Sequence, residues 1–255
     1  MTCLKSLCAV VLGFSCLVGC GASDDSPVTP SPSSSSTALD LDDVKSNTSN
    51  YDWFDFRPGI QKLILSGTAD AKHIAILWYT EEDGGVALHY HSKTESVYVI
   101  EGTQTDAKAT YPSGTVYFNP PGSGHQVTDS TGFFLLAYAA PPDFASTDSI
   151  GDYTPIRIDT ADLTGYEFEE QQADVKTFSP ALDSEGGLSA EFIETTSANA
   201  FTYTGNYVLV LQGSCVIDGT TYGEKSLVVA KAVEPLPYRI SASKGADCLV
   251  LGVSF

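Results

Sequence analysis

The chain has 255 residues, with 13 basic and 32 acidic side chains and a formal net charge of −19 at pH 7. Such an acidic surface repels phosphate backbones, which excludes a nucleic-acid-binding protein. Hydrophobic residues make up 42% of the chain, enough to bury a core, so a wholly disordered chain is excluded as well. The length suits one large domain or two of ordinary size.

Residues 1–19 have the layout of a secretory signal peptide. Lys5 supplies a positive charge, and residues 6–19 form an apolar run that is too short for a transmembrane helix. The run ends at Leu17-Val18-Gly19-Cys20, which resembles a bacterial lipobox, whose cysteine carries acyl chains after cleavage. We therefore expect Cys20 to anchor the chain to a membrane leaflet without spanning it. An ordinary signal peptide with an incidental cysteine is the alternative.

The expected location is the bacterial cell envelope. Gly21, and not an aspartate, follows Cys20, which favours the outer membrane, facing the periplasm or the cell surface.

Residues 20–50 are predicted to form a disordered tether. Residues 26–37 consist of Ser, Thr and Pro apart from Val28, and five aspartates lie between residues 20 and 50. Such a segment buries too little apolar surface to order itself. The folded part is therefore expected to begin near Tyr51.

The remainder of the chain is typical of an all-β protein. Short runs rich in Val, Ile, Tyr and Phe alternate with Gly, Pro, Asp or Ser, and the pattern breaks at residues 140–142. This spacing predicts two all-β units, each a sandwich or a barrel, at residues 51–150 and 151–255. The candidate strands are 62–66, 73–79, 86–91, 96–101, 115–119, 124–128 and 133–139 in the first unit, and 190–195, 207–212, 215–218, 226–231, 238–241 and 248–254 in the second.

The two halves repeat one another in part. Residues 95–102 and 206–213 share the pattern of a polar residue, an apolar run, a polar residue and a glycine. This repeat indicates an internal duplication. The folded region also keeps two cysteines, Cys215 and Cys248, which an oxidising compartment would pair; two separate buried thiols are the alternative.

Three of the four histidines lie close together in the first half, at His89, His91 and His125. A strand places His89 and His91 on one face, about 7 Å apart at Cα, and Glu95 has the same parity. A Pro/Gly turn at residues 119–124 then delivers His125 at the start of a strand. Imidazoles with one carboxylate suit Fe, Zn, Mn, Ni, Co or Cu. These four residues are therefore predicted to hold one divalent transition metal, against the alternative of polar side chains on a half-buried sheet.

The same residues form a known signature. The pattern His-x-His-(x)3-Glu-(x)6-Gly is matched by His89, His91, Glu95 and Gly102, and Pro-x-Gly-x-x-His is matched by Pro120, Gly122 and His125, with Gly114 at the spacing that opens this second motif. Over residues 84–125 the chain resembles the cupin superfamily, and as a whole it is similar to ChrR-like bicupins. The resemblance implies two jelly-roll β-barrels in tandem and one metal on the four ligands. The departures lie in loops: Gly84 is one residue late, with Asp83 at the expected position, Asp129 replaces an asparagine, and the gap 103–113 is short.

The second half lacks this ligand set. Aligning Gly213 with Gly102 places Ala200, Thr202 and Asn206 at the first three ligand positions, and Glu234 falls opposite His125. The resemblance therefore implies a degenerate second cupin without metal, serving as a packing partner or as an apolar ligand pocket. It also places Cys215 and Cys248 on strands that cupins usually pair, which favours the disulfide.

The sequence leaves three alternative functions open for the predicted metal. The first is catalysis on a small oxygen-rich substrate, dioxygenase-like or isomerase-like by the resemblance, with no residue that names one reaction. The second is non-catalytic binding or sensing, and the third is a structural clamp. His73, the fourth histidine, is expected to be structural or to line the pocket rather than to act as a ligand. The expected partners are a small-molecule substrate or ligand and the membrane, with a homodimer as an open alternative.

Replacing Cys20 by serine removes the acyl acceptor. We expect Cys20→Ser to move the protein from the membrane fraction to the soluble envelope fraction, because no other segment is predicted to hold it at a membrane. Fractionation followed by immunoblotting measures this shift. Unchanged membrane partitioning would contradict the lipoprotein interpretation.

Overall fold

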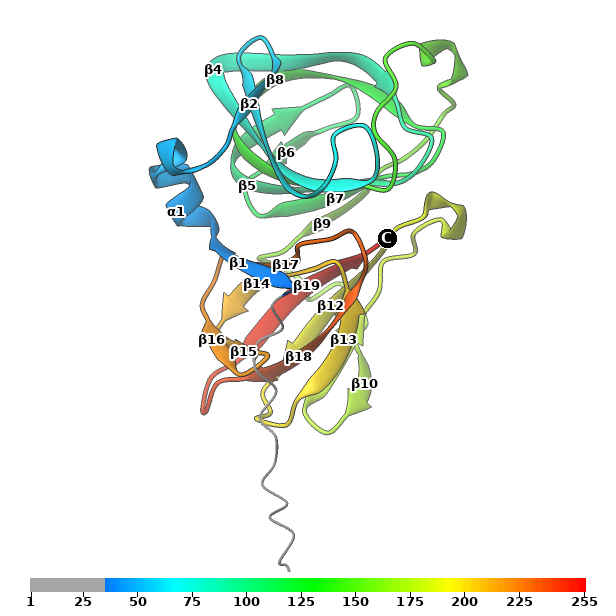
Figure 1. Ribbon diagram of the computed structural model, residues 1–255. Helices are drawn as coiled ribbons and strands as arrows, with labels where there is room; N and C mark the ends of the chain where they lie inside the picture. The colour runs from blue at the N-terminus through cyan, green and yellow to red at the C-terminus, as the bar shows by residue number, and fades with distance from the viewer. Residues whose placement is uncertain (1–34) are drawn as a thin grey trace, which may run out of the picture.

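The computed structural model describes residues 35–255, except for the side chains of Glu82 and Asp83. Most of these residues lie in strands that form two stacked β-barrels (Figure 1). The all-β prediction with two jelly-roll units is confirmed. The predicted signal peptide and Cys20 lie outside the described residues. Among the described residues, no helix has the length and apolar character needed to cross a membrane.

The first barrel is built from one eight-stranded antiparallel sheet. Its order is β2-β3-β4-β8-β5-β7-β9, and β6 pairs with β5. The strands are β2 (Phe54–Arg57), β3 (Ile60–Gly67), β4 (His73–Tyr90), β5 (Glu95–Thr105), β6 (Thr110–Pro112), β7 (Thr115–Asn119), β8 (Gly124–Tyr138) and β9 (Ile156–Asp159).

Strands β4 and β8 are each continuous where the sequence pattern predicts two strands. They pair with each other from His73↔Tyr138 to Tyr90↔Gly124, and register shifts between Tyr79 and His89 let the ladder bend. A bulged strand can turn a corner without ending, because the extra residue increases the local twist. The glycine-rich segment at residues 84–85 therefore marks a bend in β4 and not a loop.

The second barrel has a seven-stranded sheet, β1-β17-β14-β19-β12-β11-β10, facing a four-stranded sheet, β13-β18-β15-β16. Its strands are β1 (Ser36–Asp40), β10 (Glu169–Gln172), β11 (Val175–Phe178), β12 (Ser189–Thr195), β13 (Phe201–Gly205), β14 (Tyr207–Gly213), β15 (Cys215–Ile217), β16 (Thr220–Tyr222), β17 (Ser226–Ala230), β18 (Leu236–Ala242) and β19 (Cys248–Ser254). The described helical segments are α1 (Leu41–Ser46), η1 (Thr48–Asn50), η2 (Thr147–Ser149) and η3 (Ser184–Gly186).

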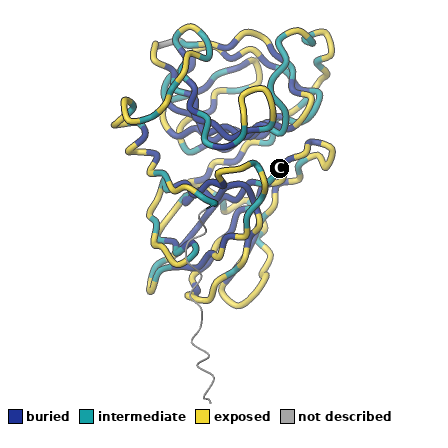
Figure 2. The backbone as a smooth tube through the Cα atoms, in the orientation of Figure 1, coloured by how far each residue is buried: buried dark blue, intermediate teal, exposed yellow. Residues whose placement is uncertain are grey.

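The two barrels share an apolar core where their large sheets meet (Figure 2). Strand β5 shows why: each residue of 95–100 is buried, and alternate side chains serve different cores. Val97 and Val99 point into the first barrel, whereas Tyr98 and Ile100 join the core shared with the second barrel. Since side chains alternate across a strand, an unbroken apolar run requires cover on both faces.

Two strands cross the predicted boundaries at residues 50 and 150. β1 precedes the first barrel in sequence but pairs with β17 of the second, from Ser36↔Ala230 to Asp40↔Ser226. β9 follows the first unit, at residues 156–159, and pairs with β7 of the first barrel. The two units therefore exchange chain segments at their junction.

The prediction of a tether reaching residue 50 is wrong for residues 36–50, which are folded. Asp40 caps helix α1 by accepting hydrogen bonds from the backbone N–H groups of Asp42 and Asp43. These two aspartates lie in the first helical turn, where negative charge is favoured. Leu41 and Val44, three residues apart, are buried in the shared core. The acidic composition that suggested disorder thus belongs to a capped amphipathic turn.

A disulfide joins Cys215 of β15 to Cys248 of β19. This selects one of the two alternatives that the sequence leaves open. Both residues are buried in the apolar interior of the second barrel, and the bond links its two sheets. It stabilises the fold by restricting the unfolded chain over a separation of 33 residues.

Truncating Leu41 tests whether the N-terminal segment is part of the fold. We expect Leu41→Ala to lower the free energy of unfolding by about 2–4 kcal/mol, because it opens a cavity in a fully buried core. The matched control is Leu88→Ala at an exposed leucine, with an expected change within about 0.5 kcal/mol. Urea denaturation measures both. Equal, small effects would show that residues 36–50 do not pack as described.

Candidate metal centre

Three imidazoles converge inside the first barrel. His89 on β4 lies directly opposite His125 on β8 in the strand register, and His91 follows one residue after β4 ends. One nitrogen of each ring lies within 4.8 Å of the others, and all three residues are buried. The strand parity of His89 and His91 thus brings both rings to the same side as His125.

Glu95, the first residue of β5, adds an oxygen to this group. Its Oε2 atom lies 3.4 Å from Nε2 of His91 and 3.6 Å from Nε2 of His125. Asn119, its register partner on β7, donates a hydrogen bond to the same oxygen at 2.8 Å. The structure therefore brings all four sequence-predicted residues together, with three nitrogens and one carboxylate facing one another.

The Pro/Gly turn before β8 fixes the backbone around His91. The N–H of His91 donates to the carbonyl of Ser123, and the N–H of Gly122 donates to the carbonyl of His91, both at 2.8 Å. Gly122 has a φ of +82°, which glycine adopts without strain. A Cβ at Gly124 would lie 2.6 Å from the carbonyl oxygen of His89, so only glycine permits this close approach. The turn thus holds the strand ends that carry the three histidines.

Asp106, which the sequence analysis missed, orients His125. Its Oδ2 atom accepts a hydrogen bond from Nδ1 of His125 at 2.8 Å. Its Oδ1 atom accepts the N–H groups of Lys108 and Ala109 at 2.7 and 3.0 Å, which fixes the carboxylate in the turn after β5. A carboxylate behind an imidazole is a common support for a metal ligand, because it fixes the tautomer and turns Nε2 toward the ion. An aspartate opening a short turn was the one available signal, and it does not reveal the contact with His125.

His89 is oriented in a similar way. Its Nδ1 atom donates to the backbone carbonyl of Ala87 at 2.9 Å, which leaves Nε2 as the free nitrogen. Burial lowers the pKa of His89 to about 3, and the neighbouring imidazoles act in the same direction. The ring is therefore neutral, the form that binds metals.

The remaining polar atoms fit a cation. Both ring nitrogens of His91 are buried without a hydrogen-bond partner among the described residues, a state that costs free energy unless something binds there. Although burial opposes ionisation of Glu95, the imidazoles of His91 and His125 hold its pKa below the ordinary value. Burial likewise opposes protonation of His125, but its hydrogen bond to Asp106 and the nearby carboxylate of Glu95 raise its pKa to about 9. The two carboxylates thus favour positive charge at a point where a metal ion can replace the proton.

The group borders a narrow cavity in the barrel interior, with a volume of about 10 Å³, which is room for a single water or ion. His89, Glu95 and His125 line it together with aromatic side chains such as Tyr138 and Phe144. His73 is buried near Tyr138, with ring centroids 4.9 Å apart, and its Nδ1 atom contacts the carbonyl of Ala71. It belongs neither to the three-histidine cluster nor to the lining of this cavity, which agrees with the structural role among the two expected.

The second barrel holds no comparable group among its described residues. Asn206, at the position of Glu95, donates a hydrogen bond to the carbonyl of Val233 and accepts one from the N–H of Phe255. Thr202 and Glu234 are exposed, as is Ala200. Apolar side chains and the disulfide fill the interior, so this barrel is a degenerate copy.

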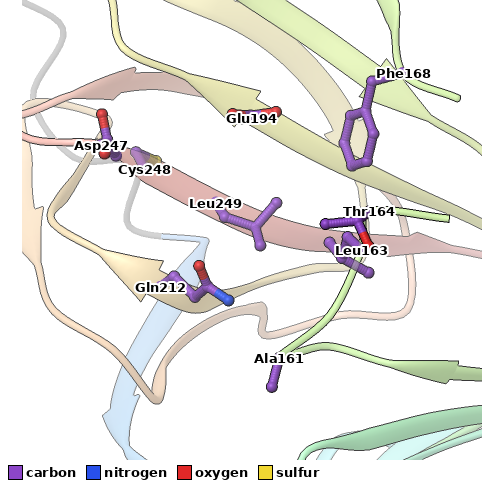
Figure 3. Close-up of a pocket in the computed structure, with 9 residues that line it drawn as sticks. All are labelled: Ala161, Leu163, Thr164, Phe168, Glu194, Gln212, Asp247, Cys248 and Leu249. Carbon is purple, nitrogen blue, oxygen red and sulfur yellow. The ribbon is translucent and has the colours of Figure 1, made fainter. Parts of the chain in front are cut away.

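A larger hollow, with a volume of about 340 Å³, lies outside the second barrel (Figure 3). Residues 161–168 form one wall, and Glu194, Gln212 and Leu249 on three neighbouring strands form the other. It contains carboxylates but no imidazole, and therefore lacks the nitrogen ligands of the first barrel.

The sequence of the first barrel matches a known protein family. Residues 42–141 match the family described as the ChrR Cupin-like domain. No curated protein matches the chain by sequence.

Solved structures resemble nearly the whole chain. A cupin 2 conserved barrel domain protein from Leptotrichia buccalis has a TM-score of 0.56 at 10% identity, covering 86% of this chain and 95% of that one. A "putative dioxygenase" from Nostoc punctiforme has a TM-score of 0.54 at 12% identity, covering 86% and 82%. A mutant of Bacillus subtilis oxalate decarboxylase has a TM-score of 0.52 at 11% identity, covering 89% and 79%. At these identities the likeness shows the fold alone.

Two substitutions at the centre are expected to reduce metal binding to different degrees. His91→Ala removes a ligand and should abolish stoichiometric metal, whereas Asp106→Asn should weaken metal affinity by about 10- to 100-fold, because an amide nitrogen would then face Nδ1 of His125 and cannot accept its hydrogen bond. Asparagine keeps an oxygen for the turn, so the variant should remain folded, which thermal melting of the metal-free protein checks. Elemental analysis after dialysis against a competing chelator measures metal content.

The control is Asp148→Asn, at an exposed aspartate outside the centre. Full metal content in His91→Ala would count against the site, and an unaffected affinity in Asp106→Asn would count against the supporting role of that carboxylate.

Proposed function

We propose that this chain, whose residues 42–141 match the ChrR Cupin-like domain and whose fold is similar to that of solved cupin structures, is a metal-dependent enzyme acting on a small oxygen-rich organic molecule. The ligands would be His89, His91, Glu95 and His125, holding one divalent transition metal: Fe, Zn, Mn, Ni, Co or Cu. The observation that carries the proposal is the convergence of three imidazoles and a carboxylate on a buried cavity.

The residues of the chain prepare this site for chemistry. A metal in such a setting polarises bound oxygen groups and holds reactants side by side, as dioxygenases and isomerases require. Ala87 and Asp106 fix the orientation of His89 and His125 before any ligand arrives, which lowers the cost of binding. Phe144 packs on the ring of His89 with centroids 5.3 Å apart and keeps water from that side of the centre.

The structural neighbours support an enzyme in general terms. They include an oxalate decarboxylase, with Mn(II) centres, and a protein named as a dioxygenase. Both are similar to this chain at 10–12% identity, so they support the fold and agree with a metal-dependent enzyme, but they indicate neither a reaction nor a substrate.

We also propose that the protein works outside the cytoplasm, anchored through lipid on Cys20. The signal-like segment at residues 1–19 supports this location. The disulfide between Cys215 and Cys248 agrees with it, because such bonds persist in oxidising compartments.

Substrate turnover separates the enzyme from a binding or sensing protein. Purified protein, with its metal content measured, would be incubated in air and under argon with small diketones, hydroxy acids and phenols. We expect one class to be consumed by wild-type protein and by the Asp148→Asn control but not by His91→Ala. Mass spectrometry follows products, and an oxygen electrode separates dioxygenase-like from isomerase-like chemistry.

Tight binding of a compound that is recovered unchanged would favour the sensor. Metal that resists azide and whose removal unfolds the barrel would indicate a structural clamp.

A further inference from the structure

Aromatic rings and cations alternate along one wall of the cavity. The guanidinium of Arg57 lies 4.3 Å from the ring centroid of Phe144 and 4.7 Å from that of Phe56. The Nζ atom of Lys62 lies 4.8 Å from the centroid of Phe56 and 4.9 Å from that of Tyr138. The series therefore runs Phe144, Arg57, Phe56, Lys62, Tyr138, which we call the cationic wall.

The cationic wall belongs to the metal cavity. Its three rings, of Phe56, Tyr138 and Phe144, line the same cavity as His89 and Glu95. Tyr138 is also the register partner of Glu95 across β5 and β8. The positive charges of Arg57 and Lys62 thus lie directly behind the surface that a bound molecule would touch.

Neither of these two cations forms an ion pair: no described side-chain carboxylate lies within 4.0 Å of Arg57 or Lys62. Glu95 attracts Lys62 from a longer distance. Lys62 is only 1% exposed, and its burial lowers its pKa to about 8. Burying a cation without a counterion is costly, and the cation–π contacts offset only part of that cost.

Two basic residues at one cavity are unusual in a chain with so few of them. The chain has only 13 basic residues against 32 acidic ones, yet two basic residues stand together at this cavity. An apolar residue at position 62 would fill the barrel at lower cost. Attraction to Glu95 opposes the lowering of the Lys62 pKa without cancelling it, which leaves the positive charge available to a bound molecule.

We propose that Arg57 and Lys62 make the metal centre selective for a small organic anion, a carboxylate with a second oxygen donor. The inference rests on the proposed function and narrows its substrate class to hydroxy or keto acids, and it disfavours neutral diketones and phenols. The charges of Arg57 and Lys62 balance those of the carboxylates of Glu95 and Asp106, so a bound metal dication would leave the cavity positive overall. In such an enclosed, weakly screened space, net charge discriminates strongly between anionic and neutral ligands.

Matched ligands test this selectivity without turnover. Glycolate and glycolamide share a hydroxyl and a carbonyl oxygen and differ in charge. Calorimetric titration of Mn(II)-loaded protein should show glycolate binding at least about tenfold more tightly than glycolamide. Lys62→Met and Arg57→Gln should each weaken glycolate binding by about tenfold and leave glycolamide within about twofold.

Two further variants complete the design. Lys62→Arg keeps the charge and should retain the preference for glycolate, and Lys244→Met, at an exposed lysine of the second barrel, should behave as wild type. Arg57 is partly exposed, so Arg57→Gln keeps the test valid even if the Lys62 variants unfold.

Metal content distinguishes a failure of the anion selectivity from a failure of the proposed function. Wild-type protein that holds one metal but binds both ligands equally would overturn the anion selectivity alone, as would Lys62→Met and Arg57→Gln variants that keep the full preference. Wild-type protein that takes up no Mn(II) or other transition metal would overturn the proposed function, and the selectivity with it.

Discussion

The pairing of β4 with β8 is the constraint on which the centre depends. It sets His89 opposite His125 and, through the turn at residues 120–124, brings His91 beside them. A shift of one residue in this ladder would send the imidazoles to opposite faces, because side chains alternate along a strand. The centre is therefore a property of strand register, and the bulges in β4 are the places where that register is corrected.

The second barrel supports this arrangement from outside. Strand β5 carries Glu95 and is covered by the first barrel's interior on one face and by the second barrel on the other. A strand packed on both sides has little freedom to move, which keeps the carboxylate in place beside the histidines. The copy that lost its ligands thus retains a physical role.

The sequence identified what depends on local order. Parity along a strand and a Pro/Gly turn were enough to group His89, His91, Glu95 and His125, and the spacing of apolar runs was enough for an all-β fold. Contacts formed only on folding were not predictable: Asp106 contacts His125 and Lys62 contacts Tyr138, and no local sequence pattern indicates either pair. The segment at residues 36–50 was misjudged because composition alone does not distinguish an acidic helix cap from an acidic linker.

The crossing of β1 and β9 between the barrels limits how the chain can be divided. A fragment ending at residue 150 would lose β9, and a fragment starting at residue 151 would lose β1. Each would expose an unpaired strand edge and hydrophobic surface that the other barrel covers. Because each barrel includes a strand from the other half's sequence, neither half is an independent folding unit that gene recombination could delete or transfer alone.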